Sequence, residues 1–283
     1  MLKIIMDNWS RTLDGRIKMN YSKTYKNIDI AGHQLEYYWT RSRNINDTEL
    51  IFLHDGLGSA ELWRDFPEKK SDMCGLPSLV YSRYGYGNSE KLSRPRKIDY
   101  MHFEALEVLP TLRKELNIKK PILIGHSDGA SIALIHAGAN QWPVKAMVIE
   151  APHVFVENRS IAGIERVRED YIQKNLRAKL LKYHRDPDSC FYGWNDIWLD
   201  PKFRSWNIEN YLRQIGCPTL VIQGDIDEFG TTAQVDAIRR QLGGVVKTKI
   251  FSSCGHSPHK DHPQKTLNII CKFLNKYLDV YKL

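Results

Sequence analysis

The amino-acid sequence predicts an α/β fold in which a mostly parallel sheet carries helices on both faces. Short apolar runs alternate with longer segments of helical periodicity through most of the 283 residues, which is the pattern of parallel strands joined by helical crossovers. Hydrophobic residues make up 42% and charged residues 26% of the chain, values typical of globular proteins. Glycine, serine, histidine and acidic residues follow directly after four of the apolar runs. Because ligands of open parallel sheets bind beyond the carboxyl ends of the strands, we expect the functional site there.

The expected elements follow one another in a regular order. Residues 25–40 alternate loosely around an Ala-Gly-His turn and predict a β-hairpin. The expected strands after it cover residues 49–54, 77–83, 120–125, 144–150, 217–224 and 245–251. The expected helices cover residues 59–73, 101–117, 130–139, 231–242 and 263–277.

The alternation lapses between Glu150 and Cys217. Residues 158–184 and 191–215 have helical periodicity without a convincing strand, which predicts a helical cap at 153–210, inserted in a core of residues 1–152 and 211–283. Most aromatic residues of this cap should form its own small core. Trp194 and Trp198, four residues apart, are the candidates for lining a substrate pocket.

Composition narrows the class of protein. Five cysteines without a CxxC pair predict neither a disulfide framework nor a zinc knuckle. The chain has no run of 18 apolar residues and its amino terminus lacks the apolar region of a secretory signal, so a cytoplasmic protein is expected. A net charge of +8 favours acidic partners. The basic residues are spread through mixed-charge segments without a zinc-finger, RNP-like or basic-zipper pattern, which argues against nucleic acid.

Four short stretches carry the residue types of a catalytic site. "GHSDGAS" at 125–131 places a serine between two glycines where a predicted strand ends and a helix begins. "HDGLGS" at 54–59, "QGDIDEFG" at 223–230 and "SSCGHSPH" at 252–259 each follow another strand. The carboxyl edge of the sheet should therefore collect a serine, acidic residues, a histidine and glycine-rich turns.

In this order the four stretches resemble the α/β-hydrolase fold superfamily over residues 25–280. The resemblance implies that Ser127 is a nucleophile on a strained strand-to-helix turn, which requires small neighbours such as Gly125 and Gly129. It implies that His256, after the last strand, is the base, and that Asp227, three residues after a glycine, orients it.

Alternatives remain for the base and for the acid. His259 and His262 compete with His256, and the HxxHxxH spacing could indicate a metal site, although prolines at 258 and 263 interrupt the helix that would align the ligands. Asp225 and Glu228 compete with Asp227. Glu150 is a remote fourth candidate, because some relatives of this fold take the acid from that strand.

The resemblance also implies an oxyanion hole from the backbone N–H groups of Leu57 and Asp128, with Gly56 and Gly58 allowing close approach. Serine at the turn disfavours the epoxide-hydrolase and haloalkane-dehalogenase chemistry of relatives with aspartate there. His126 stands where carbon–carbon hydrolases commonly have asparagine, so ester hydrolysis without metal or other cofactor is expected first. Carbon–carbon bond hydrolysis of the meta-cleavage type and a non-catalytic ligand-binding role are the alternatives.

The substrate is expected to be either a free small-molecule ester or an ester borne by acyl carrier protein. The superfamily includes pimeloyl-carrier methyl esterases of biotin synthesis, and carrier domains are strongly acidic. Residues 174–185 carry five basic side chains and no acid, which suits such a partner, although a solvated helix face is the simpler reading. The candidate docking residues are Lys174, Arg177, Lys179, Lys182 and Arg185.

Overall fold

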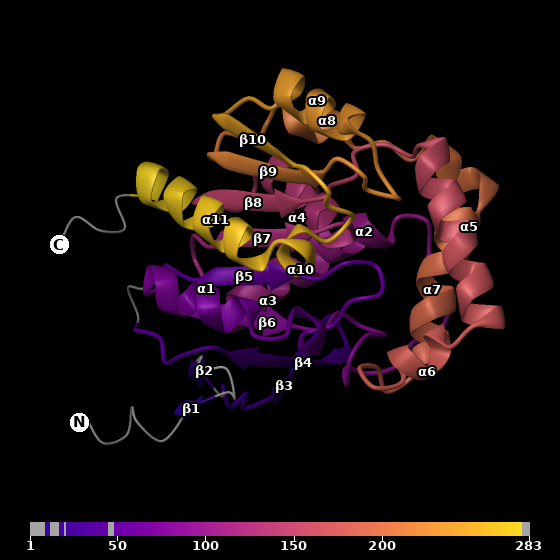
Figure 1. The fold of residues 1–283 in the computed structure, drawn as a ribbon, viewed down its shortest axis with the longest axis horizontal. Helices are drawn as coiled ribbons and strands as arrows, with labels where there is room; N and C mark the ends of the chain where they lie inside the picture. The colour runs from indigo at the N-terminus through magenta and orange to yellow at the C-terminus, as the bar shows by residue number, and fades with distance from the viewer. Residues whose placement is uncertain (1–8, 12–16, 20, 45–47, 279–283) are drawn as a thin grey trace.

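The computed structural model describes residues 9–11, 17–19, 21–44 and 48–278 and contains an eight-stranded sheet (Figure 1). The strand order is β10-β9-β8-β7-β5-β6-β4-β3, parallel from β10 to β6 and antiparallel at β6–β4 and β4–β3. The expected α/β fold with a mostly parallel sheet is confirmed. The strands are β3 Lys26–Ile30, β4 His33–Trp39, β5 Leu50–Leu53, β6 Ser78–Tyr81, β7 Ile122–His126, β8 Ala146–Glu150, β9 Thr219–Gly224 and β10 Val246–Phe251. A separate antiparallel pair comprises β1 Trp9–Arg11 and β2 Ile17–Met19.

The central strands are buried on both faces, which explains why the sequence shows them as continuous apolar runs. Every residue of β5 to β9 is buried, whereas most of the edge strand β10 is exposed. Alternate side chains enter different cores: Ile51 and Leu53 belong to one, Leu50 and Phe52 to the other. The sheet therefore needs a helical layer on each side.

The two helical layers come from different parts of the chain (Figure 1). The helices α1 Phe66–Cys74 and α11 Pro263–Leu278 pack together on one face, where η1 Glu61–Trp63 and α10 Pro258–Asp261 also lie. The other face carries α2 Tyr100–Phe103, α3 Leu109–Glu115, α4 Asp128–Gly138 and α9 Thr232–Gln241.

The helix expected over 101–117 is interrupted by a π-helical turn, η2 Glu104–Val108. The N–H of Leu109 donates to the carbonyl of Glu104, and in this wider pattern the carbonyl of Ala105 would need the N–H of residue 110. Pro110 has no N–H. The ring of His136 supplies the missing donor, with Nδ1 2.7 Å from the Ala105 oxygen.

Helices α5 Asn158–Gln173, α6 Leu176–Leu180 and α7 Pro187–Leu199 pack on one another beside the sheet (Figure 1). The chain is extended at Lys174, so the continuous helix expected over 158–184 is divided there. The 3-10 helix η3 Pro201–Ser205 follows, and α8 Glu209–Leu212 packs against α4 and α9. Among the described residues, no helix combines the length and apolar character needed to cross a membrane.

Aromatic packing holds α5, α7 and η3 together. Tyr171 stacks on Phe191 with ring centroids 3.7 Å apart, and Trp198 contacts both Phe203 and Trp206. All five rings are at most 7% exposed. The aromatic residues of this segment are buried as expected, but they do not form a separate core, because they belong to the same hydrophobic cluster as Ile51 and Leu53 of the sheet.

Candidate active site

Ser127 occupies a sharp turn between β7 and α4. Its φ of +53° lies in the region that L-residues rarely adopt, as expected for a strained strand-to-helix turn. The flanking glycines are required by packing: a Cβ at Gly125 would lie 2.5 Å from the Gly129 oxygen, and a Cβ at Gly129 would lie 2.0 Å from the Leu53 oxygen. The N–H of Ser127 is fixed by the carbonyl of Glu150 at 2.9 Å.

The three residues expected from the sequence meet at this turn. The hydroxyl oxygen of Ser127 lies 2.8 Å from Nε2 of His256, and both carboxylate oxygens of Asp227 lie 2.9 Å from Nδ1. Ser127 follows β7, Asp227 follows β9 and His256 follows β10. This geometry allows the histidine to take a proton from the serine while the carboxylate fixes the ring tautomer.

Further hydrogen bonds hold the Asp227 carboxylate in place. Oδ1 accepts from the N–H groups of Phe229 at 2.8 Å and Gly230 at 3.2 Å, and Oδ2 accepts from Nε2 of Gln223 at 2.6 Å. Asp227 is 1% exposed. A buried carboxylate with this many donors keeps one orientation toward His256.

Charge and burial act in opposite directions on the Asp227–His256 pair. Burial of the imidazole disfavours its protonation, but the charge and hydrogen bond of Asp227 outweigh burial, so the pKa of His256 is raised. Burial likewise opposes ionisation of Asp227, but the charge and hydrogen bond of His256 lower the pKa of the carboxyl group. The pair is therefore suited to hold an imidazolium during a reaction.

The other candidate acids have different partners. Asp225 accepts the N–H of Cys254 at 3.3 Å, and Glu228 accepts the backbone N–H of His256 at 3.3 Å. Glu150 accepts both the N–H and Nδ1 of His259, at 3.0 and 2.9 Å. Asp227 alone of these four carboxylates contacts the His256 ring.

The three histidines of the HxxHxxH stretch point to separate partners. His256 faces Ser127, His259 faces Glu150, and Nε2 of His262 donates to the carbonyl of Ser252 at 3.2 Å. Over the described part of the chain, no three His, Cys, Asp or Glu side chains are grouped to hold a metal ion.

The loop after β5 borders the site and carries Leu57. A Cβ at Gly56 would lie 2.0 Å from Nε1 of Trp194, and a Cβ at Gly58 would lie 2.0 Å from Oδ1 of Asp55, so both glycines allow close packing. Leu57 lines the same cavity as Ser127. Asp128 begins α4, so its N–H is one of the free donors at a helix N-terminus.

The Asp128 side chain points to other groups. It accepts a hydrogen bond from the Tyr100 hydroxyl at 2.5 Å and lies 4.0 Å from the Arg83 guanidinium. The side chain of Asp128 is completely buried. Its backbone N–H is the group available to a substrate oxygen.

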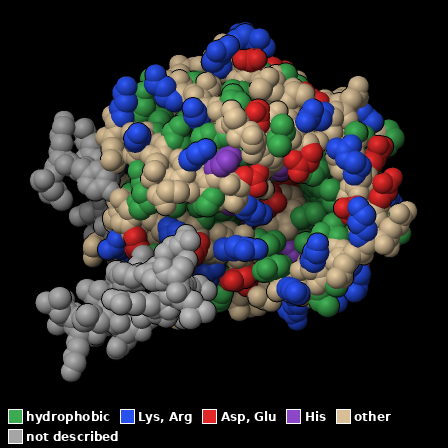
Figure 2. Space-filling view, in the orientation of Figure 1, with side chains coloured by type: hydrophobic (Ala, Val, Ile, Leu, Met, Phe, Trp, Pro, Cys, Tyr) green, Lys and Arg blue, Asp and Glu red, His purple; other side chains and the backbone are tan. Residues whose placement is uncertain are grey.

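A cavity of about 310 Å³ opens above Ser127, and Figure 2 shows the molecule hollowed between the sheet layer and the helices beside it. Trp194 and Trp198, the two pocket candidates, both line it. Its apolar wall also includes Ile164, Val167 and Leu176. Its charged lining consists of carboxylates, with neither Lys nor Arg among the described lining residues. These are the carboxylates of Asp55, Asp170 and Glu228, because the Asp128 side chain is completely buried beside Tyr100.

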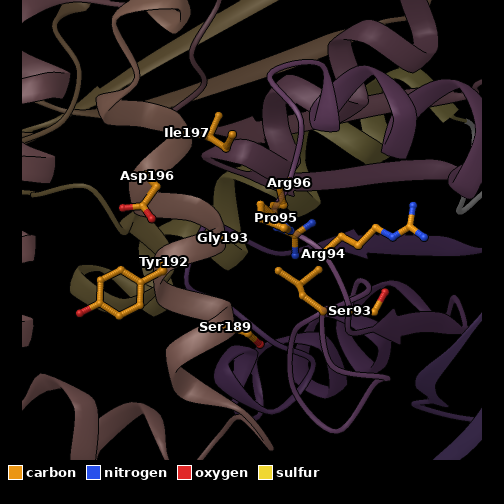
Figure 3. A pocket seen from close by; sticks show the side chains of 10 residues that line it. Ser93, Arg94, Pro95, Arg96, Ser189, Tyr192, Gly193, Asp196 and Ile197 are labelled. Carbon is orange, nitrogen blue, oxygen red and sulfur yellow. The ribbon is translucent and has the colours of Figure 1, made fainter.

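A second cavity, of about 300 Å³, lies on the other side of α7, where the loop carrying Arg94 and Arg96 faces Gly193 (Figure 3). Its lining includes the hydroxyl groups of Ser93 and Ser189 but no described histidine that could activate them. Of these two cavities, the one above Ser127 is suited to nucleophilic chemistry.

Two further histidines lie in the site region: His126, considered in the sequence only as a replacement for asparagine, and His153, which the sequence motifs do not include. His126 donates from Nε2 to the carbonyl of His256 at 2.7 Å and so supports the loop that carries the base. His153 lines the cavity. It stands three residues after the end of β8, so the rule that functional residues follow parallel strands would have found it.

The five basic residues of 174–185 differ in their surroundings. Lys174 pairs with Asp170 at 2.6 Å, and Arg177 pairs with Asp188 at 2.5 Å. Lys179 and Lys182 are exposed and form no ion pair with any described residue. Arg185 lines a separate surface cavity with Tyr25 and Glu61.

Comparison with known proteins identifies the family of this chain. The chain is 27% identical to Serine hydrolase BPHL of Homo sapiens, with 79% of this chain and 77% of the relative covered. It is 24% identical to Proline iminopeptidase of Saccharolobus solfataricus (94% and 95% covered) and 25% identical to Putative esterase/lipase 2 of Mycoplasma genitalium (80% and 88% covered). The solved structure of VinJ matches with a TM-score of 0.73 and 17% identity, over 90% of this chain and 99% of that one. The sequence profile described as Alpha/beta hydrolase family matches residues 50–269. This chain belongs to the alpha/beta hydrolase family.

Proposed function

We propose that this hydrolase cleaves carboxylic esters through an acyl-enzyme on Ser127. The observation that carries the proposal is the continuous contact from the Ser127 hydroxyl through the His256 ring to the Asp227 carboxylate, at 2.8 and 2.9 Å. Relatives named serine hydrolase and esterase/lipase support it.

Each half of the reaction uses the same groups. His256 Nε2 accepts the Ser127 proton while Ser127 Oγ attacks the ester carbonyl carbon. The resulting oxyanion accepts hydrogen bonds from the backbone N–H groups of Leu57 and Asp128. The C–O bond then breaks, and His256 gives its proton to the departing alcohol. Water attacks the acyl-enzyme with His256 again as base, which releases the carboxylic acid and restores Ser127.

The cavity lining supports an apolar acyl group. Ile164, Val167 and Leu176 give one apolar wall, and the two indoles of Trp194 and Trp198 give large flat surfaces. Such a lining stabilises a hydrocarbon chain by removing it from water. We expect activity on short and medium acyl chains.

A fluorophosphonate probe tests the assignment of the nucleophile. The wild-type protein should be labelled once, at Ser127, and Ser127→Ala should not be labelled. Ser257→Ala is the matched control, because Ser257 lines the same cavity while its side chain forms no hydrogen bond within the described chain. Labelling that persists in Ser127→Ala, or is lost in Ser257→Ala, would contradict the proposal.

Removal of an N-terminal residue from a peptide is the second candidate. It is favoured by the carboxylates of the cavity, among them Asp55 and Glu228. The free amino group of a peptide substrate is a cation, and these carboxylates would attract it. Relatives named proline iminopeptidase support it. Hydrolysis of prolyl 4-nitroanilide but not of its N-acetyl form would establish this activity, whereas turnover of nitrophenyl butyrate alone would favour the esterase.

We also propose that the exposed surface of α6 and of the turn after it, which carries Lys179 and Lys182, docks an acyl carrier protein that delivers the ester. The support is electrostatic: Lys179 and Lys182 are exposed and form no ion pair with a described residue, while Lys174 and Arg177 are already paired. In the double variant Lys179→Glu/Lys182→Glu, hydrolysis of a carrier-borne methyl ester should fall at low salt while the free methyl ester is unaffected. Equal rates on the two substrates at every salt concentration would rule out the docking site.

A further inference from the structure

His153 lies in the wall of the cavity, and its ring has no hydrogen-bonding partner among the described residues. The residue is 2% exposed, its ring meets Trp198 edge-on with centroids 5.0 Å apart, and it lies 5.7 Å from the His256 ring. Its backbone is anchored, since the carbonyl accepts the Ser131 hydroxyl at 2.6 Å. The ring position is therefore set by the end of β8 and by packing.

Neither ring nitrogen of His153 hydrogen-bonds to a described residue. Nδ1 is fully buried, so Nε2 is the ring nitrogen that a molecule in the cavity can reach. Buried polar groups are normally paired, and a phenylalanine would fill this space without a polar group to satisfy. Burial lowers the pKa of His153 to about 4, so the ring is neutral near pH 7. A neutral imidazole offers one donor and one acceptor, which suits an uncharged polar group.

The position of His256 determines which part of the substrate comes close to His153. His256 must hand its proton to the departing oxygen, so the leaving group lies against the His256 ring. The carbonyl oxygen instead faces the N–H groups of Leu57 and Asp128. His153 and His256 are neighbours in the cavity wall, so a group within reach of His153 belongs to the leaving alcohol.

We propose that His153 recognises the leaving group by a hydrogen bond, so that the site takes esters whose alcohol carries a second uncharged polar group, such as a hydroxyl, close to the ester oxygen. This specificity rests on the proposed ester hydrolysis and adds the class of alcohol to it. The Ser127 hydroxyl hydrogen-bonds to His256 and not to His153, so the proposal gives His153 no part in proton transfer.

A pair of esters of nearly equal size tests the proposal. 2-Hydroxyethyl butyrate and propyl butyrate differ only by a hydroxyl in place of a methyl group on the leaving alcohol. We expect the wild type to favour the hydroxyethyl ester about fivefold in kcat/KM, as one neutral hydrogen bond allows. In His153→Phe this ratio should fall to that of the non-enzymatic reaction, and His153→Gln, which keeps a donor and an acceptor, should restore part of it.

The control places the same hydroxyl on the other side of the ester. Propyl 3-hydroxypropanoate and propyl butyrate, which also differ by a hydroxyl in place of a methyl group, should give a kcat/KM ratio that is equal in wild type and in both variants. Because each ratio is taken within one preparation, loss of folded protein in a variant does not alter it.

Three results separate the possible failures. The role of His153 would be overturned if the wild-type kcat/KM ratio of the hydroxyethyl to the propyl ester is no larger than the non-enzymatic ratio. It would also be overturned if His153→Phe leaves this ratio unchanged. Both results count even when Ser127 is labelled and esters are turned over. A ratio that changes equally for the acyl-side pair would overturn the assignment to the leaving group. Absence of both ester turnover and Ser127 labelling would overturn the proposed function, and the proposal for His153 with it.

Discussion

Replacing Asp227 by asparagine should lower kcat on a nitrophenyl ester by about 10⁴-fold while leaving the fold intact. The carboxylate and the His256 ring are in contact at 2.9 Å, and a charge pair about 4 Å between centres contributes about 4 kcal/mol at a protein dielectric of about 20. In the transition state His256 is an imidazolium, and loss of its attraction to the carboxylate corresponds to a fall in kcat of about 10³-fold.

The tautomer of His256 should account for the rest of the effect. The N–H groups of Phe229 and Gly230 both donate to Oδ1 of Asp227, so the asparagine oxygen should take that position. Its NH₂ group then faces Nδ1 of His256 and favours the tautomer with the proton on Nε2. Nε2 can then no longer accept the Ser127 proton.

The pH profile gives an independent measure of the same interaction. His256 acts as a base in its neutral form, and its pKa is raised, so wild-type kcat/KM should fall as pH drops through a value above 6.5. Removing the negative charge lowers this pKa. The residual activity of Asp227→Asn should therefore persist to lower pH than that of the wild type.

Asp225→Asn is the matched control, because this exposed carboxylate two residues away contacts the Cys254 N–H and not the histidine. It should stay within about threefold of wild type in kcat. Equal losses in Asp225→Asn and Asp227→Asn, or an acid limb that does not move in Asp227→Asn, would refute the reasoning.

Three further changes test how the site is built. Gly129→Ala places a Cβ 2.0 Å from the Leu53 oxygen and should lower the free energy of unfolding by about 3 kcal/mol in urea titration; an unchanged midpoint would contradict the packing argument. Glu150→Ala leaves two buried donors of His259 unpaired and should also lower the free energy of unfolding by about 3 kcal/mol. Glu150→Gln should keep kcat within about tenfold of wild type. A loss of kcat of about 10⁴-fold in Glu150→Gln would instead make Glu150 the acid of the catalytic triad. Trp194→Ala enlarges the cavity and should move the optimum of a nitrophenyl-ester series to longer acyl chains; an unmoved optimum would remove this indole from the acyl pocket.

The sequence was a good guide where local signals are strong. Five central strands are fully buried, so each appeared as a short apolar run, and the residues after them converge because parallel strands end at one edge. The contact between Ser127, Asp227 and His256 could be expected for that reason. The choice of Asp227 over Asp225 depended on the family resemblance.

Other features depend on contacts between residues far apart in the chain. Glu150 and His259 are 109 positions apart, and nothing in either stretch indicates their pairing. The extended residue Lys174 breaks a segment whose periodicity is helical throughout, and we find no local signal for that break. His153 belongs to no motif, so only its place after β8 and its unpaired ring distinguish it.

Trapping the acyl-enzyme tests the central claim most directly. The protein would be mixed with 4-nitrophenyl butyrate, quenched in acid within the first turnovers, and analysed by intact mass and peptide mapping. The account predicts a burst of nitrophenolate equal to the enzyme concentration and a single butyryl group on Ser127, with neither in Ser127→Ala. Turnover without a covalent intermediate, or a butyryl group on another residue, would contradict it.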